Sequence, residues 1–168
     1  MMPPHNERRT EGGAHVLDQG TLKRLTDAAD RTEIYQALVR YCCGVDRSSE
    51  AMVNSAFHAG ALDDHGGGPR PATELAHGIA THAHRPQLHI TTNVLIELDG
   101  DSANVESYFF LSPISADDGP VVPFRQGRYL DRFERRDGAW KIVNRRVVDP
   151  SGGRWVPSQP APATPPAR

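Results

Sequence analysis

The chain is short of cysteine and of long apolar runs, and each of these absences excludes a class of protein. Its only cysteines are Cys42 and Cys43, and adjacent cysteines bridge each other only with backbone strain. We therefore expect two free, packed thiols in a reducing compartment. No apolar run approaches the roughly 18 residues of a membrane-spanning helix, and no apolar signal core follows the charged N-terminus. The sequence thus predicts a cytoplasmic protein with no membrane segment.

Net charge is also nearly absent, which argues against large anionic partners. The 168 residues carry a formal net charge of -2, so no overall field attracts nucleic acid or an anionic membrane. Lys and Arg are scattered, without the aromatic-basic stripe of a nucleic-acid surface. The glycine run at 66–68 has no Lys-Ser or Lys-Thr after it, unlike a phosphate-binding loop. A small molecule is therefore the expected partner.

Large apolar residues are scarce at both ends of the chain: residues 1–17 are polar with two Pro and two Gly, and the chain after Asp149 is rich in Pro, Gly, Ser and Ala. Such segments bury too little apolar surface to offset the entropy of ordering them. We predict a disordered N-terminal tail over residues 1–17, one domain over 18–150, and a Pro-rich disordered C-terminal tail over 151–168.

Two consecutive helices are expected at the start of this domain. Thr21 is a typical helix cap, and Asp30 with Glu33 matches a capping box that begins a second helix. Gly44 is expected to close the second helix, so that Asp46 lies where the chain leaves it, at the edge of the core. The apolar residues of the second helix recur at spacings of three and four, and they are Ile34, Ala37, Leu38, Tyr41, Cys42 and Val45. Shorter helices are predicted after Ser48 or Ser49 and from Pro71 to about His84.

From His89 the apolar spacing changes to two, which predicts strands. Strict alternation would place Ile90, Thr92, Val94, Ile96 and Leu98 on one face, and His89, Thr91, Asn93, Leu95 and Glu97 on the other. Turn signals at Asp99-Gly100-Asp101 and Asp137-Gly138 join two consecutive hairpins.

Helices first and strands afterwards predict an α+β fold with the helices on one face of a mostly antiparallel sheet. Because both faces of the His89 strand carry apolar residues, a second subunit is the natural cover for the other face. We therefore expect a homo-oligomer, a dimer or a trimer.

An ordered set of short motifs over about residues 20 to 150 resembles the SnoaL-like family of the nuclear transport factor 2-like superfamily. The matching pieces are Arg40-Tyr41, Val45-Asp46-Arg47, Phe57-His58, Asp63-Asp64-His65-Gly66, His89-Ile90-Thr91-Thr92-Asn93, Leu98-Asp99-Gly100-Asp101, Gly127-Arg128-Tyr129-Leu130-Asp131 and Asp137-Gly138-Ala139-Trp140-Lys141-Ile142. The resemblance implies a cone-shaped α+β barrel with a deep apolar cavity and chemistry without a cofactor. The superfamily includes polyketide cyclases, dehydratases and steroid isomerases, but also proteins with no catalytic activity, so the fold does not settle the function.

The resemblance also implies a catalytic pair, Asp46 and His89, at the mouth of the cavity. A histidine near neutral pKa can remove a proton next to a carbonyl or give one to a leaving hydroxyl. A neighbouring carboxylate orients the ring and stabilises its charged form. Tyr41 lies five residues before Asp46, the spacing of a tyrosine in the dehydratase-like relatives, and its hydroxyl would polarise a substrate oxygen. The alternatives are a turn residue for Asp46, a core histidine for His89 and core packing for Tyr41.

Three further residues are candidates for substrate binding. Arg145 matches a basic residue frequent on the last strand of the family, where it would hold an oxyanion, and pairing with a surface carboxylate is the alternative. Without a bulge, Trp140, Ile142, Asn144 and Arg146 share one face and Arg145 takes the other, but the pattern does not say which face is the pocket. Asn93 and Tyr108 are candidate polar wall residues.

A metal site is the weaker alternative. His77, His82, His84 and His89 include a His-x-His spacing known among metal ligands, but residues two apart on a helix point in different directions. We therefore expect no metal. The sequence leads to three hypotheses: a cofactor-independent dehydratase, isomerase or cyclase acting on a small apolar oxygenated metabolite such as a polyketide, terpenoid or steroid-like compound; a non-catalytic ligand-binding or structural subunit; and metal-assisted hydrolysis.

Overall fold

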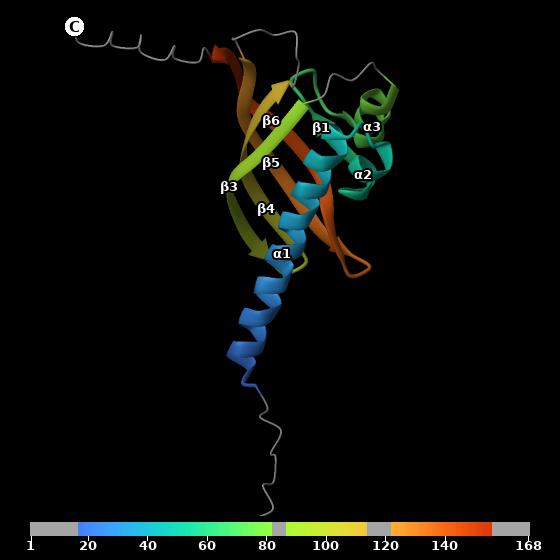
Figure 1. The fold of residues 1–168 in the computed structure, drawn as a ribbon. Coiled ribbons are helices and arrows are strands. Elements are labelled where there is room, and N and C mark those ends of the chain that lie inside the picture. The colour runs from blue at the N-terminus through green and yellow to red at the C-terminus, as the bar shows by residue number, and fades with distance from the viewer. Residues whose placement is uncertain (1–16, 82–86, 114–121, 156–168) are drawn as a thin grey trace, which may run out of the picture.

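The computed structural model describes residues 17–81, 87–113 and 122–155, and in these ranges three helices pack against one curved, six-stranded sheet (Figure 1). The elements are α1 (Gln19–Asp46), α2 (Glu50–Ser55), β1 (Phe57–Asp64), β2 (Arg70–Pro71), α3 (Ala72–Thr81), β3 (Gln87–Asp99), β4 (Ser102–Pro113), β5 (Val122–Arg136) and β6 (Ala139–Trp155). The strand order is β2-β1-β6-β5-β4-β3, so the sheet has two unpaired edges and does not close. The predicted α+β class is confirmed.

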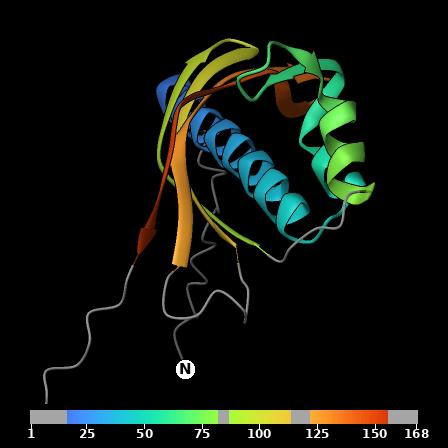
Figure 2. The ribbon, with the colours of Figure 1, turned by 90° about the horizontal axis from the view of Figure 1, so that it is seen from above.

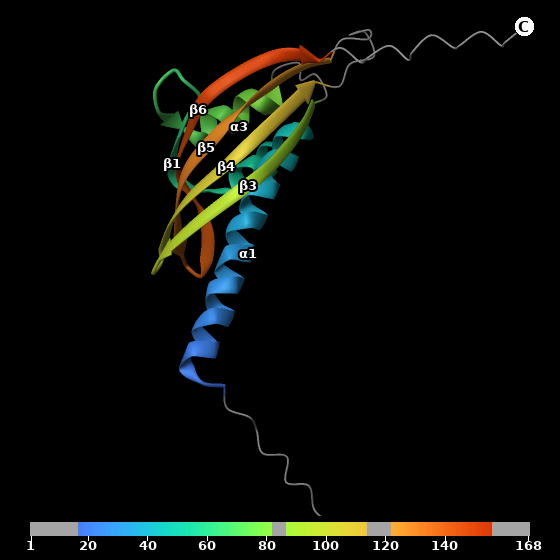
Figure 3. The same cartoon turned by 90° about the vertical axis from the view of Figure 1, so that its left-hand side faces the viewer.

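Helix α1 lies on the concave side of the sheet, which curves around it (Figure 2). Its apolar stripe forms most of the helical part of the core, including Ile34, Leu38 and Val45. The N-terminal turns of α1 project beyond the sheet (Figures 1 and 3), where Leu22 and Leu25 are exposed. The C-terminal half of the helix is therefore the half that packs into the core.

The predicted break between two helices is wrong, because α1 runs unbroken for 28 residues. The N-cap is Asp18 rather than Thr21, and its carboxylate accepts hydrogen bonds from the Thr21 backbone N–H and hydroxyl. Asp30 is not a cap either. It is buried inside the helix and accepts hydrogen bonds from Trp140 Nε1 at 2.9 Å and Arg135 Nη1 at 2.8 Å. These bonds attach α1 to the β5–β6 hairpin, which a local reading of the sequence could not foresee.

Gly44 also has a different role from the one predicted, since α1 continues two residues beyond it to Asp46. A Cβ atom at this position would lie 2.7 Å from the backbone nitrogen of Val53. Glycine therefore lets α2 pack directly on α1. The predicted cap of α2 is confirmed at Ser49, whose hydroxyl accepts a hydrogen bond from Met52 N.

A β-bulge in β3 decides which of its side chains face the core. Thr92 pairs with Tyr108 and Leu95 with Glu106, so β3 has one extra residue between these pairs. Asn93 lies there with φ 50°, a conformation that Asn tolerates better than most residues. Strict alternation is therefore wrong: His89 and Thr91 before the bulge share the inner face with Val94, Ile96 and Leu98 after it.

A β-bulge in β6 likewise decides which of its side chains face the core. Asn144 pairs with Arg132 and Ile142 with Phe133, which leaves Val143 as the extra residue. As a result Trp140 and Ile142 are buried before the bulge, and Arg145 and Val147 are buried after it. Arg145 thus points into the core and Arg146 does not, a choice that simple alternation cannot make.

The hairpins, β1, α3 and the end of β6 can also be compared with the sequence-based predictions. The turns at Gly100-Asp101 and Asp137-Gly138 join the two expected hairpins. Strand β1 pairs in parallel with β6, the one parallel pairing among the described strands. Helix α3 ends at Thr81, and the predicted extension to His84 lies outside the described residues. Strand β6 continues to Trp155, beyond the composition-based boundary at residue 150.

Candidate active site

Asp46 and His89 meet at the C-terminal end of α1, where the helix passes the beginning of β3. His89 Nδ1 lies 2.6 Å from Asp46 Oδ1. The backbone N–H of His89 also donates to the same carboxylate, at 3.2 Å from Oδ1 and 3.1 Å from Oδ2. The side chains of His89 and Asp46 are 5% and 20% exposed, respectively. The predicted proximity of these two residues is confirmed, and we refer to them as the Asp46–His89 pair.

The geometry of this pair determines the chemistry of the imidazole ring. Because an ionised carboxylate only accepts hydrogen bonds, the 2.6 Å contact assigns a proton to Nδ1. In the neutral ring the basic lone pair then lies on Nε2. The second bond, to the His89 backbone, fixes the carboxylate itself. In such an arrangement a histidine is able to act as a general base, because the partly buried carboxylate orients the ring and stabilises its charged form.

The cysteine next to the pair is a packing residue. Cys42 is buried on α1, and its Sγ lies 2.9 Å from Thr91 Oγ1 on the inner face of β3. Burial raises the pKa of the Cys42 thiol, which lowers the fraction of reactive thiolate at neutral pH. The sequence-based interpretation of this cysteine as a packed free thiol agrees with its surroundings.

Tyr41 lies five residues before Asp46 on α1 and is buried in a cluster of aromatic rings. Its ring makes edge-on contacts with Phe57 and Tyr129, at centroid distances of 5.9 and 5.8 Å. Its hydroxyl lies 3.4 Å from His65 Nε2. Burial raises the pKa of Tyr41 far above its ordinary value, although the Arg145 charge opposes this effect. Tyr41 is therefore a neutral hydroxyl at rest, in contact with a second histidine.

Arg145 lies at the centre of this cluster and is fully buried. Its Nε and Nη2 donate to the two carboxylate oxygens of Asp131 at 2.8 and 2.6 Å, a bidentate ion pair. The guanidinium stacks on the rings of Tyr41 and Tyr129, at 4.2 and 4.0 Å from their centroids. Burial opposes its charge, but the charge and hydrogen bonds of Asp131 hold the pKa of Arg145 well above the ordinary value. The carboxylate partner that the sequence suggested is thus inside the core rather than on the surface.

Three residues near Arg145 were not among the predicted site residues. Asp63 pairs with Arg145 in the β1–β6 register, and its Oδ2 lies 2.9 Å from Nδ1 of His65. Asp131 follows Tyr129 and precedes Phe133 at a spacing of two, a period that would have placed its carboxylate on the inner face. The sequence around Asp63 and His65 has no such alternation that would have indicated that their side chains lie near Arg145. Arg145 Nη1, Asp63 Oδ1 and Ser107 Oγ are buried without hydrogen-bond partners among the described residues.

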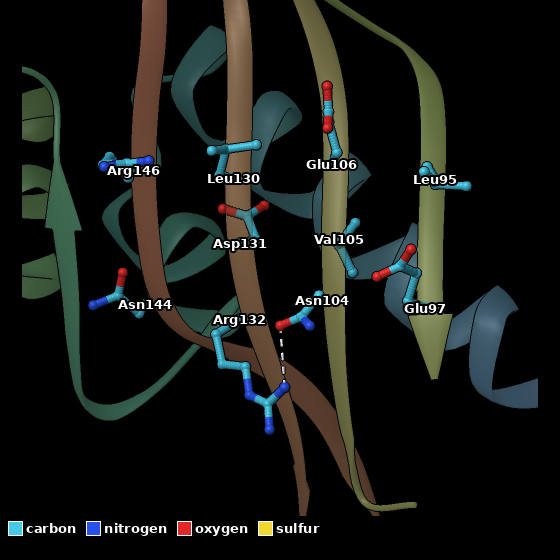
Figure 4. A pocket seen from close by; sticks show the side chains of 10 residues that line it. All are labelled: Leu95, Glu97, Asn104, Val105, Glu106, Leu130, Asp131, Arg132, Asn144 and Arg146. Atoms are coloured by element: carbon cyan, nitrogen blue, oxygen red, sulfur yellow. Dashed lines mark hydrogen bonds between the residues drawn. The ribbon is translucent and has the colours of Figure 1, made fainter. Parts of the chain in front are cut away.

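The structure does not bring Asn93 and Tyr108 together with the Asp46–His89 pair. Both line a cavity of about 480 Å³ that also includes Thr92, Gln126 and Arg128. Tyr108 alternates with the inward-facing residues of β4 and is exposed on the outer face of the sheet. A larger hollow of about 570 Å³ lies on this outer face, and Figure 4 shows its lining of carboxylates, guanidinium groups and Leu95.

Neither a metal cluster nor a membrane-spanning helix is found in the described parts of the chain. Within those ranges, no three His, Cys, Asp or Glu side chains are placed to hold a metal ion. His82 and His84, two members of the histidine group considered above, lie outside the described residues. None of the three described helices is long and apolar enough to span a membrane.

Comparison with known families and proteins agrees with this architecture. The sequence profile of the SnoaL-like domain matches residues 26–146, a span that contains the Asp46–His89 pair and the Tyr41–Arg145 cluster. No protein of curated function matches the sequence.

Solved structures share the fold at low sequence identity. A nuclear transport factor 2-like protein with a cystatin-like fold from Novosphingobium aromaticivorans is 19% identical, with a TM-score of 0.65 over 79% of this chain and 91% of that one. A proposed scytalone dehydratase from the same species is 19% identical, with a TM-score of 0.63 over 75% and 89%. A hexachlorocyclohexane dehydrochlorinase from Novosphingobium barchaimii is 23% identical, with a TM-score of 0.59 over 79% and 93%. These likenesses confirm the fold class.

Proposed function

The chain belongs to the SnoaL-like family, and from this premise we propose that it is a cofactor-independent acid/base enzyme, a dehydratase, isomerase or cyclase. Its substrate would be a small, largely apolar, oxygenated metabolite, such as a polyketide, a terpenoid or a steroid-like compound. Solved structures of the same fold include a dehydrochlorinase and a proposed dehydratase, whose names denote eliminations. These likenesses support the reaction class and leave the substrate to experiment.

The observation that carries the proposal is the 2.6 Å contact between His89 Nδ1 and the Asp46 carboxylate. With Nδ1 protonated, Nε2 of His89 is the atom that would remove a proton from the carbon next to a substrate carbonyl. The Asp46 charge would stabilise the imidazolium that forms. A structural protein with this fold has no need for a histidine and a carboxylate in such an arrangement.

Tyr41 is proposed as the acid partner. In an elimination, its hydroxyl would donate its proton to the departing oxygen. In an isomerisation or cyclisation, it would donate a hydrogen bond to the carbonyl oxygen as negative charge develops there. The Arg145 guanidinium over the Tyr41 ring favours negative charge on this residue. The proton removed by His89 and the proton given by Tyr41 balance, so a dehydration releases water without any other reactant.

The proposal is tested with the aldol adduct of benzaldehyde and acetone, a β-hydroxy ketone that dehydrates to a strongly absorbing enone. We call it the aldol probe. The full chain should accelerate its dehydration above the rate in free imidazole. His89→Gln should lower kcat by about 10²- to 10⁴-fold, the usual contribution of a general base. Absorbance of the enone measures the rate directly.

The matched control is His77→Gln, a histidine whose side chain is 69% exposed on α3, and it should keep the full rate. Equal rates for His89→Gln and the unaltered chain would overturn the role of His89. No acceleration by the unaltered chain, together with saturable binding of the probe, would favour the non-catalytic ligand-binding subunit instead.

We further propose that the outer face of the sheet is covered by a second copy of the chain. Leu88, Ile90, Leu95 and Tyr108 are exposed there, Leu95 by 59%. The hollow shown in Figure 4 is lined by both Glu97 and Glu106 and by Arg132 and Arg146. A patch carrying both signs of charge can pair with its own two-fold copy.

Light scattering after size exclusion tests this assembly. The unaltered chain should be a dimer, and Leu95→Asp should shift it towards the monomer because a charge would then be buried at the interface. Leu25→Asp, at an equally exposed leucine on the projecting part of α1, serves as the control and should remain a dimer. A dimer that survives Leu95→Asp would place the interface elsewhere, and a trimer would contradict the two-fold pairing.

A further inference from the structure

A second histidine–carboxylate pair, Asp63–His65, contacts the hydroxyl of Tyr41 from the side of β1. His65 Nδ1 lies 2.9 Å from Asp63 Oδ2, and His65 Nε2 lies 3.4 Å from the Tyr41 oxygen. The three groups form a continuous chain from Asp63 through both nitrogens of His65 to Tyr41. No step proposed above for the Asp46–His89 pair uses His65 or Asp63.

We propose that His65, oriented by Asp63, supplies the proton that Tyr41 loses in each cycle of an elimination. When Tyr41 gives its hydroxyl proton to the substrate oxygen, protonated His65 transfers its Nε2 proton to the Tyr41 oxygen. The neutral His65 ring then takes up a proton from solvent, and His89 returns to solvent the proton that it removed from the substrate. Each transfer breaks one bond to hydrogen and forms another, and no reactant besides water is needed. The inference rests on the proposed role of Tyr41 as the acid.

The gradient of exposure along the chain supports this direction of proton transfer. Tyr41 is 2% exposed, and the Asp63 side chain is 3% exposed, but that of His65 is 42% exposed. His65 is therefore the member of the chain that reaches solvent. A buried hydroxyl that gives away its proton needs such a route, because water in the bulk does not reach it directly.

The electrostatics of Tyr41 make fast reprotonation necessary. Burial raises the pKa of Tyr41 far above its ordinary value, so its anion is unstable in this cluster and must regain a proton before the next cycle. Arg145, whose guanidinium lies 4.2 Å from the Tyr41 ring centroid, stabilises the transient negative charge. It cannot donate a proton to Tyr41, because arginine does not lose its proton in proteins. His65 is the described side chain whose ring nitrogen contacts the Tyr41 hydroxyl, and an imidazole ring can both give and take up a proton.

The turn after β1 holds His65 in place for this contact. The carboxylate of Asp64 accepts hydrogen bonds from the backbone N–H groups of Gly66 at 2.8 Å and Gly68 at 3.0 Å. Both glycines have positive φ angles, 98° and 91°, a conformation that favours glycine. The charged or titratable groups that face the His65 ring are Asp63 on β1, Tyr41 on α1 and, farther away, Asp131 on β5 beside Arg145 on β6.

Fluorine NMR of the full chain labelled with fluorotyrosine tests the coupling without any substrate. The chain has four tyrosines, and Tyr41→Phe assigns the Tyr41 resonance. We expect this resonance to shift with pH in the unaltered chain, to lose that shift in His65→Gln, and to keep it in His77→Gln. A Tyr41 resonance whose pH response is unchanged in His65→Gln would overturn the inference.

The aldol probe provides the catalytic readout. In the unaltered chain, kcat should fall at alkaline pH, because only the protonated His65 ring carries the Nε2 proton that Tyr41 takes up. His65→Gln should lower kcat roughly tenfold, leave KM unchanged and abolish that alkaline limb, a smaller effect than removing the general acid itself. A purely structural His65 would change stability or KM and leave the shape of the pH profile intact, which would overturn the inference.

The two measurements separate this inference from the proposed function. If the unaltered chain does not act on the aldol probe but the Tyr41 resonance follows His65, the proposed activity fails and the proton path stands as a property of the fold. If the probe is turned over but His65→Gln retains the alkaline limb and the pH response of Tyr41, the activity stands and the proton path is wrong.

Discussion

Replacing Asp46 by Asn should leave the fold intact and lower kcat on the aldol probe by roughly 10³-fold or more, as expected when an oriented base loses its carboxylate partner. The carboxylate accepts hydrogen bonds from both the ring Nδ1 and the backbone N–H of His89. An amide of the same shape carries no charge to stabilise the imidazolium. Its NH₂ group can also donate to Nδ1, which would move the ring proton to Nε2 and remove the basic lone pair from the atom that needs it.

The matched control is Asp27→Asn, at an exposed carboxylate on the same helix that pairs with Lys23. This variant should keep full activity and nearly full stability, because exposed ion pairs contribute little. Circular dichroism and thermal unfolding establish that both variants are folded. Full turnover by a folded Asp46→Asn protein would remove Asp46 from the mechanism, whatever the distance between the two side chains.

The second large effect is expected on stability, at the buried ion pair between Asp131 and Arg145. Both side chains are 0% exposed, and the Asp131 carboxylate accepts hydrogen bonds from Nε and Nη2 of the Arg145 guanidinium. Asp131→Asn would leave a buried cation that cannot lose its proton. We expect this change to lower the free energy of unfolding by roughly 3–5 kcal/mol, the usual cost of breaking a buried pair, as measured by denaturant unfolding.

Arg145→Met should have a different, pH-dependent cost, because the group left behind is a carboxyl that can take up a proton. Burial raises the pKa of Asp131, and the Arg145 charge opposes this. Without Arg145, the folded protein would bind that proton more tightly than the unfolded chain does. The stability of Arg145→Met should therefore rise as pH falls from neutrality towards the unfolded-state pKa of about 3.9. Asp131→Asn should show no such recovery.

The double variant Asp131→Leu with Arg145→Met distinguishes breaking the pair from removing it. Replacing both charges by apolar side chains should restore most of the lost stability, because neither partner then remains buried alone. Asp27→Asn is again the control for a carboxylate whose loss costs little. If the double variant is as unstable as Asp131→Asn, the cost comes from packing of the guanidinium between Tyr41 and Tyr129 rather than from the uncompensated charge.

Local patterns were sufficient for much of the fold. The change of apolar period at His89, the two turn signals with glycine, and the order of helices before strands predicted the α+β class and both hairpins. These features depend on residues that are close in the sequence, where backbone preferences act directly. The proximity of Asp46 and His89 is different, because it followed from a family resemblance and not from any property of the intervening residues.

The sequence-based predictions were wrong where a single bulge residue changed which side chains of a strand face inward. They were also wrong where a contact joins residues that are distant in the sequence. The bulges at Asn93 and Val143 each reverse the inward and outward faces of the residues that directly follow them. Asp30 looked like a helix cap, but Trp140 and Arg135 reach it from 110 and 105 residues away and make it a buried anchor. No local signal distinguishes a capping aspartate from one that a distant strand will cover.

The sequence by itself therefore determined the class of the fold, the hairpins and the residue types available for acid/base chemistry, because these depend on short-range periodicity and on side-chain identity. Only the tertiary structure decided which of those residues act together. Two bulges set which side chains of β3 and β6 face inward, among them His89 and Arg145. The Asp131 carboxylate binds the Arg145 guanidinium. Asp63 contacts His65, and His65 contacts the Tyr41 hydroxyl. Such contacts depend on register and burial across the whole sheet, and a difference of one residue along a strand reverses them.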